Sequence, residues 1–288
     1  MLTVFLEMLV TITEVGSIYS LVVLAVFLTS RIIKFDDLSV DGSFATGGAI
    51  TALLCSFHVW PILLLPLAFA SGAAVGMLTG LLYTKLKINN LMSGIIVMTG
   101  IFSLNLKIAG PNVSLADSTT IFYMPKIFLH DWGNVTVLGT IIALIFIIAN
   151  WFLETELGFL LRATGSSPQM LCNLGKNVDH YRLAALMLAN GLTALAGSLF
   201  VQYTGFFSIT GSIGTLVIGL AGLIITESLS NKSCLFLILG AIGYQALIAC
   251  TIELQVDPLW NKLITACLIV IMLVIRQSKN QKLQRKLR

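Results

Sequence analysis

Long apolar stretches alternate with short polar ones along almost the whole chain. A helix needs about 20 apolar residues to cross the hydrocarbon core of a bilayer. Stretches of about this length cover residues 12–33, 42–58, 61–84, 90–109, 134–153, 182–203, 212–228, 234–252 and 259–276. No stretch has Lys, Arg, Asp or Glu near its middle, where each would cost about 2.5–3.5 kcal/mol. The pattern predicts an all-α integral membrane protein, a polytopic bundle of about nine transmembrane helices.

The second expected span, 42–58, departs from this pattern. Polar and glycine residues crowd its beginning, in the sequence DLSVDGSFATGG. Irregular backbone at membrane depth is stable only where protein or water covers it. We therefore expect a broken second helix in the interior of the bundle.

Composition supports a membrane protein and a single domain. The chain is 57% hydrophobic and 10% charged, with a mean hydropathy of +0.96, whereas soluble domains carry about 25% charged residues. We expect one transmembrane domain over residues 1–276, followed by a basic tail over 277–288. The tail is interpreted as a topology anchor, and a lipid-binding patch is the alternative. In the outer segment 110–133 we expect a short surface helix.

The basic residues indicate an orientation. With the N-terminus outside, 14 of the 17 Lys and Arg residues fall on the inner side, and Lys107, Lys126 and Lys262 fall on the outer side. Positive residues favour the cytoplasmic side of a membrane. The sequence therefore predicts a multi-pass protein with an outer N-terminus and a cytoplasmic C-terminus.

The sequence offers no constellation for catalysis. His58, His130 and His180 fall in separate loops, and neither H-E-x-x-H nor G-x-S-x-G occurs. The five cysteines form no C-x-x-C pair, so no metal site is expected. The absence of charges near the middle of the spans argues against an ion-driven transporter. We therefore expect neither an enzyme nor a nucleic-acid-binding protein.

The chain also lacks its own nucleotide site. Its Gly175-Lys176 pair does not complete a phosphate-binding loop, because Met170 stands where the first glycine belongs and Asn177 follows the lysine. If transport is powered, another polypeptide supplies the power, and no cofactor is expected on this chain.

Uncharged polar residues remain within the expected spans. Each could be a hydrogen-bonding contact between helices or could line a solute path. The candidates for the path are Ser103, Asn105, Asn190, Thr193, Gln202, Tyr244 and Gln245. Asn190 is the strongest of them, because a buried amide is costly unless it is paired. The glycine series beginning at Gly72 and Gly211 predict close helix packing, either in a sliding interface or in a static one.

Three collinear stretches carry a resemblance to a known family. They cover Arg31–Ile50, Gly80–Gly110 and Leu157–Ile225, including the sequences GFLLRATGSSPQM and LANGLTALAGSLFVQYTGF. The chain resembles the inner-membrane permeases of bacterial ABC importers, in the branched-chain amino acid and ribose permease superfamily. It is most similar to the tryptophan/tyrosine-type subgroup.

This resemblance implies partners and a docking element. It implies a pair of permeases in the lipid membrane, two cytoplasmic ATPase subunits that bind ATP and Mg, and an extracytoplasmic solute-binding protein. In such importers a cytoplasmic coupling helix docks on the ATPase, which here corresponds to the loop 154–181. The implied coupling residues are Gly158, Arg162, Ala163, Gly165, Pro168, Met170 and Gly175. Ser167 and Lys176 depart from the family pattern.

The local sequence agrees with a docking element. Pro168 suits the first turn of a helix, with Ser166 or Ser167 as its N-cap, and Gly175 suits its C-terminal end. An amphipathic loop lying on the membrane is the alternative. We therefore expect an importer permease for a small solute. The subgroup favours an aromatic or other amino acid, a sugar or nucleoside is the alternative, and a membrane enzyme or scaffold is the more distant one.

Overall fold

The computed structural model describes residues 2–116, 119–122, 133–228 and 235–253, together with isolated positions between 260 and 274. Most of these residues are helical, which confirms the all-α prediction. The longer helices are α1 (Leu2–Val26), α2 (Val40–Ser56), α3 (Pro61–Thr84), α4 (Asn90–Ala109), α6 (Gly133–Glu154), α9 (Val178–Thr204), α10 (Thr215–Ser228) and α11 (Phe236–Glu253). The shorter elements are η1 (Phe27–Ile32), α7 (Glu156–Ser166), α8 (Pro168–Asn173), η3 (Ile209–Ser212), β1 (Asn112–Ser114) and β2 (Phe206–Ser208).

Six helices in the described part of the chain are long and apolar enough to cross a membrane. They are Leu6–Ile32, Pro61–Thr84, Asn90–Ala109, Gly133–Glu154, Val178–Thr204 and Ile209–Ser228, and each matches an expected span. Helix α2 has 17 residues, and α11 offers only the shorter apolar stretch Phe236–Thr251. Most of the ninth expected span and the whole basic tail lie outside the described residues. The count of nine and the domain boundary at 276 therefore stay predictions.

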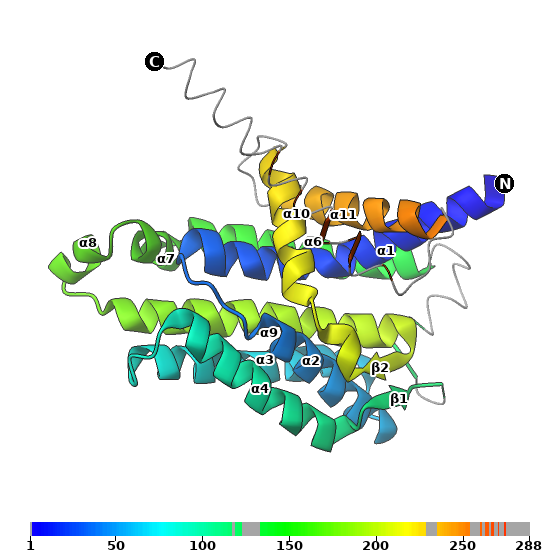
Figure 1. Ribbon diagram of the computed structural model, residues 1–288, viewed down its shortest axis with the longest axis horizontal. Helices are drawn as coiled ribbons and strands as arrows, with labels where there is room; N and C mark the ends of the chain where they lie inside the picture. The colour runs from blue at the N-terminus through cyan, green and yellow to red at the C-terminus, as the bar shows by residue number, and fades with distance from the viewer. Residues whose placement is uncertain are drawn as a thin grey trace, which may run out of the picture.

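Helix α9 lies in the middle of the bundle (Figure 1). Helices α2, α3 and α4 lie on one side of it, α1, α6 and α11 lie on the other, and α10 crosses at a steep angle (Figure 1). Small buried residues such as Ala189, Ala194 and Gly197 let neighbouring backbones approach α9 closely. Helices α7 and α8 lie at one end of the bundle, here named the α8 end, and β1 and β2 lie at the opposite end, here named the strand end (Figure 1).

Helix α3 packs closely against α9. A Cβ atom on Gly72 would collide with the backbone of Asn190, and one on Gly76 would collide with the backbone of Leu186. Gly80 likewise faces the Leu183 side chain. The glycine series in α3 thus makes the close contact that the sequence predicted, and both the sliding and the static interpretation require it.

Helix α2 lies in the interior, as predicted, but the irregular backbone precedes the helix. Twelve of its 17 residues are buried, and the helix is continuous from Val40 to Ser56. Residues 34–38 before it form neither helix nor strand, and Lys34 has a positive φ of 53°. The protein covers much of this irregular stretch, because Phe35 and Asp37 are buried. That cover is what irregular backbone needs at membrane depth.

A short sheet closes the strand end. Strands β1 and β2 pair antiparallel, with Val113 opposite Phe207. Gly205, with φ 66°, ends α9 in the left-handed conformation and lets the chain turn directly into β2. The surface helix expected in 110–133 falls largely on residues outside the described ones, and the described part of that segment contains β1.

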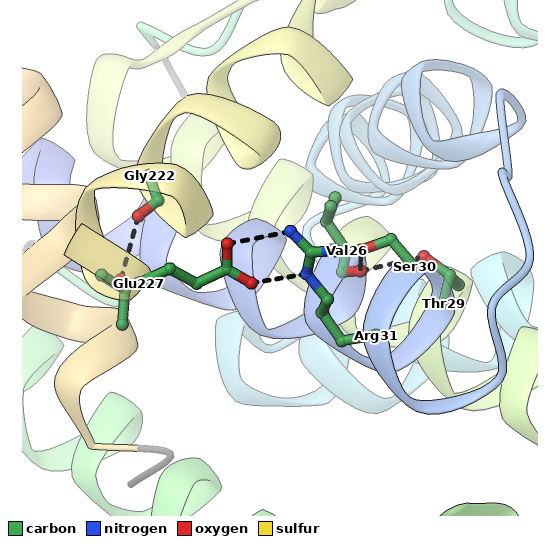
Figure 2. Close-up of polar contacts among 7 residues, drawn as sticks. Val26, Thr29, Ser30, Arg31, Gly222 and Glu227 are labelled. Carbon is green, nitrogen blue, oxygen red and sulfur yellow. Dashed lines mark hydrogen bonds and ion pairs between the residues drawn. The ribbon is translucent and has the colours of Figure 1, made fainter. Parts of the chain in front are cut away.

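An ion pair links η1 to α10 near the α8 end (Figure 2). The Arg31 Nη2 atom donates to Glu227 Oε2 at 2.8 Å, and Nε contacts the other carboxylate oxygen, so the pair is bidentate. The Ser30 hydroxyl donates to the Val26 carbonyl at 2.7 Å, and Thr29 donates to the same oxygen (Figure 2). These bonds give the Val26 carbonyl hydrogen-bond donors at the start of the wide π-helical turn of η1.

Candidate functional site

Helix α7 begins immediately after α6 and packs against the end of the first span. The Thr155 hydroxyl accepts a hydrogen bond from the Gly158 backbone N–H at 3.5 Å, which caps the helix. Gly158 is buried, and a side chain there would collide with the backbone of Leu153. A side chain on Gly165 would collide with the carbonyl of Ile32 in η1. These two glycines of the predicted coupling set therefore hold α7 close to α6 and η1.

Helix α8 is the short helix that the sequence predicted. Pro168 occupies its first turn, and Ser167 stands at the N-cap, although its side chain makes no capping hydrogen bond. The helix ends at Asn173, and the chain turns at Gly175, whose φ is 70°. The backbone N–H of Gly175 donates to Cys172, and that of Lys176 donates to Leu171, both at 3.0 Å. This pair of bonds is a Schellman motif, which glycine favours.

One buried side chain anchors α8 to the bundle. Leu171 is fully buried and packs with Ala163 of α7 and Val178 of α9. The residues beside Leu171 are open, with Met170 46% exposed and Leu174 58% exposed. The α8 end thus presents two large apolar side chains on a helix that cannot roll without exposing Leu171.

Apart from the half-buried Pro168, the predicted coupling residues divide into two groups. Gly158, Ala163 and Gly165 lie against neighbouring elements, as described above, whereas Arg162, Met170 and Gly175 are exposed. The exposed apolar side chains of Phe159 and Leu174 lie in the same segment but are not among the predicted coupling residues. Their spacing from Arg162 and Met170 along the helices was the signal that could have found them.

A buried polar network joins α2 to α9. The Asn190 amide nitrogen donates to Asp37 Oδ2 at 2.7 Å and to the Leu186 carbonyl at 3.0 Å. Its amide oxygen accepts from the hydroxyls of Ser43 at 2.5 Å and Ser39 at 3.2 Å. Asn190 is fully buried, so the structure places the strongest path candidate in a saturated contact between helices.

Asp37 is an acidic group that the sequence analysis missed. It is 3% exposed, and its Oδ1 atom accepts from the Ser39 backbone N–H at 2.8 Å and from the Ser39 hydroxyl at 2.6 Å. Asn190 is the thirteenth of the 27 residues of α9, so its partner Asp37 lies near the middle of that span. The expected absence of central charges therefore does not hold for Asp37, because the chain returns into the bundle between η1 and α2.

A second carboxylate holds the start of α10. Asp41 accepts from the backbone N–H groups of Gly214 at 2.9 Å and Leu216 at 2.7 Å. The first N–H groups of a helix have no partner within it, and a carboxylate there also favours the helix dipole. Asp41 lies in the first turn of α2 and therefore holds the junction between η3 and α10 close to that turn.

The structure does not bring the remaining path candidates together. Asn105 donates to the Thr46 hydroxyl at 3.2 Å, which ties α4 to α2. Thr193 donates to a carbonyl of its own helix at 3.0 Å, and Gln202 accepts from Ile121 at 3.2 Å. Ser103 is exposed on α4, whereas Tyr244 of α11 is buried and Gln245 is partly exposed. Among the described residues, no group of three or more His, Cys, Asp or Glu could hold a metal ion.

Comparisons with known proteins agree with this architecture. A family model for the permease component of branched-chain amino acid transport systems matches residues 8–273. A tyrosine transport system permease protein of Clostridioides difficile is 33% identical over 91% of this chain and 89% of its own length. A probable branched-chain amino acid transport permease protein of Methanocaldococcus jannaschii is 27% identical over 70% of this chain and 69% of its own length.

A more distant relative carries a different substrate name. The ribose import permease protein of Escherichia coli is 26% identical over 66% of this chain and 58% of its own length. No solved structure matches the chain significantly. The chain belongs to the permease family of branched-chain amino acid transport systems, whose members are membrane subunits of ABC transporters and not enzymes.

Proposed function

We propose that this protein is the permease subunit of an ABC importer and that a separate ATPase docks on α7 and α8. The observation that carries the proposal is the form of α8. Leu171 fixes the helix to the bundle, and Met170 and Leu174 remain exposed beside it. An exposed apolar surface rimmed by polar residues such as Lys176 is typical of a site for a protein partner.

The contacts of α7 offer a route from the ATPase to the bundle. Gly165 rests on the carbonyl of Ile32, so a displacement of α7 also displaces η1. The Arg31–Glu227 ion pair then joins η1 to α10 (Figure 2). Packed elements of this kind move as bodies, which suits alternating access between outward-open and inward-open states.

The proposal includes an orientation and further partners. The α8 end faces the cytoplasm, with the N-terminus outside and the C-terminus inside, as the basic residues predict. The ATPase binds ATP and Mg, and this chain binds no cofactor. A second permease copy and an extracytoplasmic solute-binding protein complete the importer in the bacterial inner membrane.

The proposed solute is an amino acid, with an aromatic one favoured. Support comes from the tyrosine transport permease, which matches nine-tenths of both chains, and from the branched-chain amino acid permease. A sugar is the alternative, because the ribose permease is also related, although it matches a smaller share of its own length.

Copurification and uptake test this proposal. Met170→Glu and Arg162→Glu should insert normally but lose the copurifying ATPase, and ATP-dependent uptake should fall at least about tenfold. Met170→Glu places an unpaired charge in an apolar contact, and Arg162→Glu reverses a charge at the same surface. Phe57→Glu is the matched control, since Phe57 is 69% exposed but lies at the strand end.

Two results would contradict the proposal. One is normal uptake in both α8-end variants, which would refute docking at this surface. The other is the absence of any ATP-binding protein from the purified complex, which would favour a membrane enzyme or a scaffold.

A further inference from the structure

A cavity of about 210 Å³ lies between α2, α9 and the β2–η3 turn. Four phenylalanine rings contribute to its wall, namely Phe44, Phe200, Phe206 and Phe207. Gly48 and Ser212 line it as well. None of the path candidates predicted from the sequence lines this cavity.

The rings on the inner side of the cavity are held in place. Phe44 stacks on Tyr19 with the ring centroids 6.0 Å apart and lies 5.8 Å from Phe200. Phe207 is 2% exposed, and a Cβ atom on Gly48 would lie 3.0 Å from its ring. Phe206 differs from these, because it is 46% exposed. The cavity therefore has a rigid aromatic floor and one ring at the surface.

The size and lining of the cavity select a class of ligand. An apolar cavity of about 150 Å³ in another protein takes up benzene, so this one has room for a substituted benzene ring. Aromatic rings pack favourably edge to face or offset against one another. The Ser212 hydroxyl donates to the Ile209 carbonyl at 2.7 Å, and its oxygen can still accept a hydrogen bond from a phenol.

The backbone beside the cavity is broken, as at the solute sites of many transporters. Helix η3 ends at Ser212, Gly214 has a φ of 100°, and α10 begins at Thr215 under the carboxylate of Asp41. Discontinuous helices at membrane depth mark binding sites in transporters, because irregular backbone there lines a cavity.

We propose that this cavity receives the aromatic ring of the transported solute, an inference that rests on the proposed importer function. The ring lies among the four phenylalanines, and Phe206 completes the wall after the solute has entered. The amino and carboxyl groups of the solute stay outside the apolar lining.

Uptake of radiolabelled L-tyrosine by the complete importer in vesicles tests the inference, with ribose as a non-aromatic probe. Phe206→Ala should lower tyrosine uptake by about three- to tenfold, the loss of one aromatic contact, and Phe206→Tyr should retain it. Phe57→Ala is the control, because Phe57 lies at the same end and does not line the cavity. The amount of permease that copurifies with the ATPase shows whether each variant folds.

Each outcome separates this inference from the proposed function. Unchanged tyrosine uptake in Phe206→Ala overturns the cavity and leaves the importer standing. ATP-dependent uptake of ribose without uptake of tyrosine likewise overturns the cavity inference and leaves the importer function standing. A wild-type complex that shows no ATP-dependent uptake of tyrosine, of ribose or of any other amino acid or sugar overturns the proposed function. The cavity inference falls with it.

Discussion

Replacing Asp37 with Asn should destabilise the protein although it preserves the shape of the side chain. Three donors point at the carboxylate, from the Ser39 backbone, the Ser39 hydroxyl and the Asn190 amide. An amide at position 37 would place one NH₂ group against the NH₂ group of Asn190. The variant therefore loses the bond between Asp37 and Asn190 and leaves a buried donor unpaired.

The size of the effect follows from these two losses. A hydrogen bond to a charged group contributes about 1.5–3 kcal/mol, and a buried unpaired donor costs about 1–3 kcal/mol more. Removing a buried charge relieves part of its desolvation cost, which works in the opposite direction. We expect a net loss of about 2–3 kcal/mol from the combination of these terms. At about 2–4 °C per kcal/mol, Tm should fall by roughly 4–12 °C.

Thermal unfolding of the purified protein in detergent measures this loss, and two further variants make it specific. Asp36→Asn changes the neighbouring, exposed carboxylate and should leave Tm nearly unchanged. The exchange Asp37→Asn with Asn190→Asp restores a donor facing an acceptor between the two side chains, but it should recover only part of the loss, because a carboxylate at position 190 cannot donate to the Leu186 carbonyl. A single variant with wild-type Tm, or a double variant no better than the single one, would refute the network as a source of stability.

The other predictions concern packing, capping and charge, and unfolding experiments in detergent check all of them. Gly76→Ala should cost about 3 kcal/mol or more or prevent folding, because its methyl group meets the α9 backbone, whereas Gly139→Ala has open space and should be neutral or stabilising. Asp41→Ala should cost about 1–2 kcal/mol, the usual value of a helix cap, and should speed amide exchange in the first turn of α10; unchanged exchange there would contradict the capping role. Arg31→Gln should cost less than about 1 kcal/mol, because its partly exposed ion pair with Glu227 is screened by water, and a larger loss would mean that the pair is more shielded than its exposure indicates.

Local sequence was enough to predict most of the helices, including the short helix α8. Six of the expected spans appear at nearly the predicted positions. Helix α8 runs from Pro168 to Asn173, and Gly175 follows it with a positive φ, as the proline and glycine spacing indicated. These features depend on apolar length and on backbone conformation within a few residues, so no distant contact is needed to infer them.

The burial of Asp37 inside the bundle and the hydrogen-bond partners of Asn190 could not be predicted from local sequence. Hydropathy placed Asp37 outside the spans, because it follows an apolar stretch and precedes a polar one. Only the return of the chain into the bundle brings it to Asn190, 153 positions away. The aromatic cavity has the same origin, because its rings come from α2, from α9 and from a strand that hydropathy does not reveal.

The sequence by itself therefore determined which segments are helical, which of them can cross a membrane and where the short helix α8 lies. The tertiary structure decided which polar residues stabilise the core and which remain available to a solute or a partner. Asn190 suited both roles in the sequence, and its four hydrogen bonds place it in a contact between helices. The physical reason is that burial and hydrogen-bond pairing depend on neighbours in space, and α2 and α9 become neighbours only when the bundle is assembled.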